Sequence, residues 1–116
     1  MAKVTLLEKK GCTSCTRARD WLAEHDIDFE SREFFRQRLS AEELNDLLVL
    51  TTPGELFAWR SPRAKARGLT EGEVADEALV HLMLEEPYLI RRPTVLTGDR
   101  LIVGANDKKL AEAFGS

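Results

Sequence analysis

Two cysteines three positions apart carry the most distinctive chemistry of this chain. They stand in the segment Cys12-Thr13-Ser14-Cys15, and the 116-residue sequence holds no others. The disulfide framework of a small secreted protein needs several bridges, so a single pair predicts a redox-active site or part of a metal site. Gly11 before the pair and the polar Thr13 and Ser14 within it indicate an open turn.

A helix that follows the pair decides what its thiols can do. Apolar side chains recur after Cys12 at helical spacing, at Ala18, Trp21 and Leu22, so we expect the helix to begin at Cys12. Unpaired N–H groups and the positive end of the helix dipole favour thiolate over thiol there. Only the thiolate attacks a disulfide or an oxyanion. We therefore predict that Cys12 is the nucleophile and that Cys15, one turn later, resolves the mixed disulfide.

Two other interpretations of the pair remain open. A zinc site needs four ligands, and only His25 and His81 could complete one, because the sequence has no second CxxC. Each histidine stands alone on a predicted helix, so we expect no metal. The other alternative is a pair of inert buried cysteines, which the polar turn disfavours.

The elements around the pair predict one α/β domain, residues 1–116, built on a small mixed sheet. A strand over residues 3–8 precedes the helix, and a right-handed crossover sets a second strand, over 27–35, parallel to it. Strands over 94–96 and 101–103 form a β-hairpin through a tight turn. Asn106 then caps a last helix.

A helical insertion, over about residues 40–86, separates the two halves of the predicted sheet. Ser40 with Glu43, and Thr70 with Glu73, form capping-box patterns that indicate two helix starts. The basic stretch between them is predicted either as a solvated loop or as a positive face for an anion or an acidic protein. Its basic residues are Arg60, Arg63, Lys65 and Arg67.

Arg92-Pro93 lies directly before the third predicted strand. In thioredoxin-like folds a proline at this place commonly has a cis peptide bond and faces the cysteines, and cis bonds are largely confined to X-Pro. We expect a cis bond here. The proline fixes the direction of Arg92, which we predict to be the partner of the thiolate and of an anion.

Motifs far apart in the chain together resemble those of a known family. Gly11-Cys12-Thr13-Ser14-Cys15-Thr16-Arg17-Ala18-Arg19 is followed far downstream by Ile90-Arg91-Arg92-Pro93. Further similar segments are Leu39-Ser40-Ala41-Glu42-Glu43-Leu44, Trp59-Arg60-Ser61 and Val103-Gly104-Ala105-Asn106. This combination resembles the arsenate reductase ArsC/Spx family over nearly the whole chain. The resemblance implies a thioredoxin-like, mixed four-stranded sheet with flanking helices and the helical insertion.

The resemblance also implies roles for two arginines. Glutaredoxin-coupled arsenate reductases of this family use one cysteine at the position of Cys12 and three arginines that hold the oxyanion. The first two match Arg60 and Arg92, and guanidinium groups suit tetrahedral oxyanions. The third would fall near residues 103–104, where the sequence has no arginine, and Arg100 lies at the hairpin start. We therefore expect a thiol-disulfide reductase acting on an anionic or disulfide substrate, in preference to a true arsenate reductase.

The Cys-Thr-Ser-Cys segment resembles the Spx branch, which implies an alternative function. Members of that branch are redox-sensing transcriptional regulators that bind the C-terminal domain of the RNA polymerase α subunit. A glycine in their inserted helical region is needed for this contact, and Gly54 is the nearest match, although a glycine after a helix can simply be a C-cap. Neither function implies a bound cofactor, and the expected reductants are glutathione, thioredoxin or glutaredoxin.

Composition and charge exclude several other classes. Lys and Arg number 17 against 20 Asp and Glu, a net charge of −3, so we expect no direct nucleic-acid binding. No apolar run approaches the roughly 20 residues that cross a bilayer. Residues 1–7 lack the features of a signal peptide, so we expect a cytoplasmic protein whose thiols are usually reduced.

Overall fold

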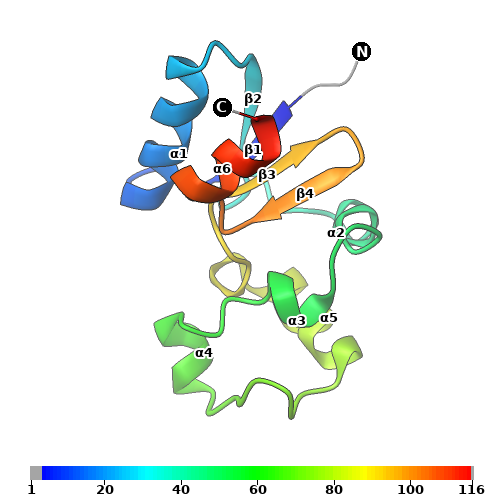
Figure 1. The fold of residues 1–116 in the computed structure, drawn as a ribbon. Coiled ribbons are helices and arrows are strands. Elements are labelled where there is room, and N and C mark those ends of the chain that lie inside the picture. Colours follow the sequence, from blue (N-terminus) through cyan, green and yellow to red (C-terminus); the bar gives the residue numbers. More distant parts are fainter. Residues whose placement is uncertain (1–3, 116) are drawn as a thin grey trace. The chain divides into compact units, whose positions relative to one another are not determined.

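A computed structural model of the chain describes residues 4–115, which divide into two compact units (Figure 1). The thiol unit comprises residues 4–37 and 92–115, and the helical unit comprises Arg38–Arg91. The expectation of a single domain over residues 1–116 stays a prediction, because a compact unit can be part of a domain. Among the helices of residues 4–115, none combines the length and the apolar character that a membrane crossing requires.

A mixed four-stranded sheet forms the centre of the thiol unit. Its strands are β1 (Val4–Glu8), β2 (Phe29–Glu33), β3 (Thr94–Thr97) and β4 (Arg100–Val103), in the order β2-β1-β3-β4. β1 runs parallel to β2 and antiparallel to β3, and β3 and β4 form an antiparallel hairpin. This arrangement confirms the predicted thioredoxin-like sheet. Residue 3, included in the first predicted strand, lies outside the described residues.

The second strand is shorter at both ends than the sequence predicts. The N–H of Ile27 donates to the carbonyl of Leu22, 2.9 Å away, which extends the turn after the preceding helix. The N–H groups of Arg36 and Gln37 both donate to the carbonyl of Glu33, at 3.0 Å. Turn hydrogen bonds thus replace strand pairing on either side of β2.

Two helices, α1 (Thr13–Glu24) and α6 (Asp107–Phe114), pack against one face of this sheet (Figure 1). The side chain of Asn106 accepts the N–H of Lys109 at 2.9 Å, which confirms the predicted cap of α6. Burial of apolar side chains between the helices and the sheet is the main stabilising contribution here. The buried cluster consists of Leu6, Ala18, Trp21, Leu22, Val95, Ile102, Ala105 and Leu110.

The helical unit confirms the predicted insertion. Its elements are α2 (Ala41–Leu47), α3 (Pro53–Leu56), α4 (Pro62–Ala66), α5 (Asp76–Glu85) and the 3₁₀ turn η1 (Pro87–Leu89). The first capping box is present, because the Ser40 hydroxyl accepts the N–H of Glu43 at 3.1 Å and the Ser40 N–H donates to the Glu43 carboxylate at 2.9 Å.

The second capping-box prediction is wrong. α5 begins at Asp76, and the preceding Ala75 makes no side-chain cap. The N–H of Glu73 donates instead to the backbone carbonyl of Thr70, at 3.0 Å. Gly72 between them has φ +89°, a left-handed conformation that cannot continue an α-helix. The motif therefore forms a turn before the helix.

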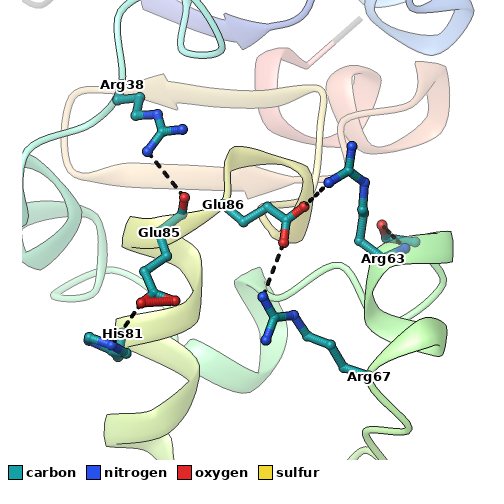
Figure 2. A network of polar contacts seen from close by, with 7 residues as sticks. Arg38, Arg63, Arg67, His81, Glu85 and Glu86 are labelled. Carbon is teal, nitrogen blue, oxygen red and sulfur yellow. Dashed lines mark hydrogen bonds and ion pairs between the residues drawn. The ribbon is translucent and has the colours of Figure 1, made fainter.

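The basic stretch of the helical unit is also more ordered than a solvated loop. Figure 2 shows that Arg63 and Arg67 both form ion pairs with the carboxylate of Glu86. In the same view, the Arg38 guanidinium donates to the carbonyl of Glu85, 3.1 Å away. Part of the stretch forms α4. Two of its predicted solvated cations are thus ion-paired within the unit.

Candidate functional site

Cys12 stands where the sequence predicts, at the start of α1. The chain leaves β1 and turns through Gly11, whose φ is +79°, and the N–H of Cys12 donates to the carbonyl of Lys9 at 3.3 Å. Cys12 is the N-cap of the helix, and its Sγ accepts the N–H of Cys15 at 3.3 Å. The sulfur of Cys12 thus caps the first turn of the helix.

Cys15 has a different environment. Both cysteines are free thiols, but Cys12 is half-buried whereas Cys15 is 1% exposed. The pKa of Cys15 is raised from 9.0 to about 12, chiefly by burial and also by the hydrogen bond with Cys12 and the charge of Cys12. A backbone hydrogen bond from Lys9 and the charge of Arg92 lower this pKa. Cys15 is consequently protonated at neutral pH.

The end of β1 is anchored just before the cysteine turn. The carboxylate of Glu8, which is 3% exposed, accepts hydrogen bonds from the Arg19 guanidinium and the Ser31 hydroxyl. The hydrogen bond to Glu8 raises the pKa of Arg19 above its ordinary value. These contacts join β1, α1 and β2, so the backbone that leads into Lys9 and Cys12 starts from a fixed point.

The histidines considered as zinc ligands make other contacts. The ring of His25 stacks on Trp21 with centroids 3.7 Å apart, and its Nδ1 lies 2.8 Å from the Trp21 carbonyl oxygen. His81 pairs with Glu85 at 3.1 Å in the helical unit. Within residues 4–115, no three His, Cys, Asp or Glu side chains gather in a way that could hold a metal ion.

Arg92 and Pro93 return the chain to the thiol unit. The Arg92–Pro93 peptide bond is cis, as predicted, and the Pro93 carbonyl accepts the N–H of Ala105 at 2.8 Å. The guanidinium carbon of Arg92 lies 5.2 Å from the centroid of the Phe35 ring. Since the charge of Arg92 acts on Cys15, the thiol unit brings together Cys12, Cys15 and Arg92.

Gly54 and Arg60 belong to the helical unit. Gly54 is the second residue of α3, so its interpretation as a C-cap is wrong; Phe57 occupies the C-cap. The indole N–H of Trp59 donates to the Gly54 carbonyl at 2.8 Å, and the next residue, Arg60, is exposed. Trp59, which precedes Arg60 in the chain, thus contacts the backbone of Gly54.

Comparison with known proteins decides the family. Residues 7–113 match the ArsC family. The chain belongs to the ArsC family. It is 36% identical over 110 residues to the regulatory protein MgsR of Bacillus subtilis, covering 93% of this chain and 87% of the relative. It is 37% identical over 109 residues to the global transcriptional regulator Spx of Enterococcus faecalis, covering 92% and 83% respectively.

A solved structure supports the fold of this ArsC family member. The ArsC family related protein from Bacteroides fragilis superposes with a TM-score of 0.84 at 23% identity, covering 95% of this chain and 97% of that one. The predicted family and fold are confirmed. Proteins named as regulators and proteins named as arsenate reductases are both similar to this chain.

A lysine of α6 contacts the segment where the ArsC resemblance would put a third arginine. The Lys109 ammonium donates to the carbonyl of Val103 at 2.8 Å. Arg100 is exposed at the start of β4. Sequence reasoning missed the contacts of Lys9 and Phe35 with the site. The one sequence signal for these contacts is that Lys9 lies three positions before Cys12 in the chain.

Proposed function

We propose that this chain is a thiol-disulfide redox protein in which Cys12 attacks and Cys15 resolves. The observation that carries the proposal is the unequal setting of the two thiols. Cys12 is half-buried, and its sulfur accepts an N–H at the start of a 12-residue helix. Cys15 is 1% exposed and holds its proton up to a pKa of about 12. One thiol is thus suited to attack from solvent and the other to act afterwards.

The reaction proceeds in two exchanges. The Cys12 thiolate attacks one sulfur of a disulfide R–S–S–R, a bond to that sulfur forms, and RS⁻ departs and takes a proton from water. The Cys15 sulfur then attacks Cys12 Sγ, and the second thiolate departs with the proton of Cys15. The substrate gains two electrons and the protein ends with a Cys12–Cys15 disulfide. A thiol reductant of the glutathione, thioredoxin or glutaredoxin class reduces it again.

The causes of the raised Cys15 pKa give these exchanges an order. Besides burial, the hydrogen bond with Cys12 and the charge of Cys12 both raise it. When Cys12 enters a mixed disulfide it loses its charge, so these contributions disappear while the charge of Arg92 continues to favour the Cys15 thiolate. Cys15 therefore becomes easier to deprotonate only after Cys12 has reacted.

The remaining site residues have supporting roles in the proposal. Arg92 and Arg60 bind anionic groups of the substrate, since guanidinium forks match carboxylates and oxyanions. Gly11, in its left-handed conformation, shapes the turn that presents Cys12. Pro93 orients Arg92, and the exposed Thr13 and Ser14 keep the first turn of α1 polar.

Variants of the two cysteines test the proposal. Cys12→Ser should abolish reduction of a disulfide substrate, whereas Cys15→Ser should accumulate a protein–substrate mixed disulfide at Cys12, visible as an added mass in intact-protein mass spectrometry. Ala23→Ser, which adds a serine at an exposed position in the last turn of the same helix, serves as the matched control and should retain turnover. Turnover by Cys12→Ser, or no adduct on Cys15→Ser, contradicts the proposed roles.

A second candidate function is transcriptional regulation, and the names of the relatives favour it. MgsR is a regulatory protein and Spx a global transcriptional regulator, and the chain spans 87% and 83% of their lengths. In this function the Cys12–Cys15 disulfide acts as a switch in the cytoplasm, and Gly54 contacts the α subunit of RNA polymerase. No bound cofactor is required.

Gly54 offers a clean test of this second function. A Cβ at this position would meet nothing within 4 Å, and Gly54 has no left-handed φ, so Gly54→Ala should leave the fold unchanged. Pull-down with reduced and oxidised protein would measure binding of the isolated C-terminal domain of the polymerase α chain. Binding in one redox state that Gly54→Ala removes supports regulation, and absence of binding in both states rejects it.

A further inference from the structure

One aromatic ring in the thiol unit carries two cations. The ammonium nitrogen of Lys9 lies 5.6 Å from the centroid of the Phe35 ring, and the guanidinium carbon of Arg92 lies 5.2 Å from the same centroid. Both distances are within the range of cation–π attraction, which holds each cation near the ring. The two charges are therefore no more than about 11 Å apart, which is comparable to the Debye length of about 8 Å at physiological salt.

Lys9 is tied to both thiols through its backbone. Its carbonyl accepts the N–H of Cys12 at 3.3 Å, and its backbone also forms a hydrogen bond with the Cys15 thiol. The charge of Arg92 acts on Cys15 as well. The two cations that share Phe35 thus belong to the immediate surroundings of the cysteine pair.

The acidic residue next to Lys9 in the chain does not oppose this positive charge at the site. Glu8 is buried, and its carboxylate is engaged by Arg19 and Ser31. Lys9 itself is half-buried, and its ammonium donates to the carbonyl of Lys10 at 3.3 Å. The contacts with the Phe35 ring and the Lys10 carbonyl orient the ammonium of Lys9, and neither of them neutralises its charge.

We propose that Lys9 is a specificity-determining residue, which acts with Arg92 to select disulfides whose sulfur-bearing groups carry carboxylates. The inference rests on the proposed attack of Cys12 and adds the substrate class. An anionic disulfide is attracted to the two cations as it approaches Cys12, and the departing anionic thiolate is formed in the same positive field. A cationic disulfide is repelled. Arg92 alone would give a weaker preference.

The test is the rate at which reduced, full-length protein reacts with two probes of opposite charge. 5,5′-Dithiobis(2-nitrobenzoate) carries one carboxylate on each half, whereas cystamine carries one ammonium on each half. Lys9→Gln removes the charge, Lys9→Arg keeps it, and Lys10→Gln removes an adjacent, exposed lysine as the matched control. The readout is the ratio of the two rate constants, because a variant that merely loosens the fold changes both rates alike.

We expect Lys9→Gln to lower the anionic-to-cationic rate ratio about threefold or more, the effect of one partly screened charge near the reacting atoms. The rate at which Lys9→Gln reacts with the anionic probe should also depend less on salt concentration than the rate of the native protein does. Lys9→Arg should restore the ratio, and Lys10→Gln should change it less than Lys9→Gln does. A ratio unchanged in Lys9→Gln, or changed equally in Lys10→Gln, overturns the inference and leaves the proposed function standing. No reaction of Cys12 with either probe overturns the proposed function itself.

Discussion

The division of labour between the two cysteines predicts very different alkylation rates in the native protein. Iodoacetamide reacts with thiolates, so each rate follows the thiolate fraction and the exposure of the sulfur. A pKa near 12, compared with the ordinary 9.0, lowers the thiolate fraction of Cys15 at pH 8 about a thousandfold. Because Cys15 is also 1% exposed, we expect its reaction to be slowed by at least this factor relative to the unfolded chain.

Mass spectrometry can measure both rates in one sample. Trypsin releases both cysteines in the peptide of residues 11–17, and fragment ions assign each adduct to Cys12 or Cys15. The native protein should accumulate a single adduct at Cys12, and the doubly modified form should appear only much later. In guanidinium chloride, where burial and the helix are lost, the two cysteines should react at similar rates. Comparable rates in the native protein, or a first adduct on Cys15, would refute the assignment of the roles.

A variant separates the causes of the slow Cys15 reaction. Cys12→Ser removes the charge of Cys12 and its thiol hydrogen bond, two of the causes that raise the Cys15 pKa, but it leaves burial in place. Cys15 should then react faster than in the native protein and still more slowly than in the unfolded chain. An unchanged rate would mean that burial alone protects Cys15, and the proposed order of the two exchanges would lose its basis.

Three further predictions concern stability. Unfolded Cys15 loses its proton above pH 9.0, whereas native Cys15 keeps it up to about 12, so this thiol stabilises the protein below pH 9 and the contribution declines as pH rises further. Urea titrations should show that the free energy of unfolding declines less between pH 8 and pH 10.5 in Cys15→Ala than in the native protein. Gly11→Ala should cost about 1 kcal/mol and lower the melting temperature by about 4 °C, because the substitution strains a φ of +79° although the new Cβ would meet nothing within 4 Å. Arg19→Ala should cost about 1–2 kcal/mol in a urea titration, since it removes one partner of the buried Glu8 carboxylate; an effect near zero would show that Ser31 and water suffice.

The parts of the fold that local sequence encodes were predictable. The capping box of Ser40 and Glu43 and the cap at Asn106 form as expected, because each depends on side chains within one helical turn. The similar pattern of Thr70 and Glu73 fails because Gly72, between them, turns the chain into a left-handed conformation before the helix. Gly72 lies inside this second pattern, where the first capping box has Glu42, so the glycine is a sequence signal that could have distinguished the two cases.

The candidate site divides in the same way. The position of Cys12 at a helix start follows from Gly11 and the apolar spacing after it, so the sequence predicts this feature well. The grouping of Lys9, Phe35 and Arg92 does not follow, because three segments far apart in the chain have to meet at one ring. Ion pairs over long separations, such as those of Arg63 and Arg67 with Glu86, are hidden from the sequence for the same reason.

The two candidate functions make different demands on the covalent connection between the units. Both thiol exchanges of the proposed enzyme take place between cysteines of the thiol unit, whereas a regulator needs the surface around Gly54, in the helical unit, to respond to their oxidation. A chain of bonds and charges offers that response: Arg92 acts on Cys15, and Arg91, joined to it by one peptide bond, donates from its N–H to the Leu56 carbonyl at 2.9 Å. Leu56 belongs to α3, the helix that contains Gly54. Redox-dependent binding at Gly54 therefore needs some connection between the two units, of which the Arg91–Arg92 peptide bond is one, whereas the exchanges between Cys12 and Cys15 need none.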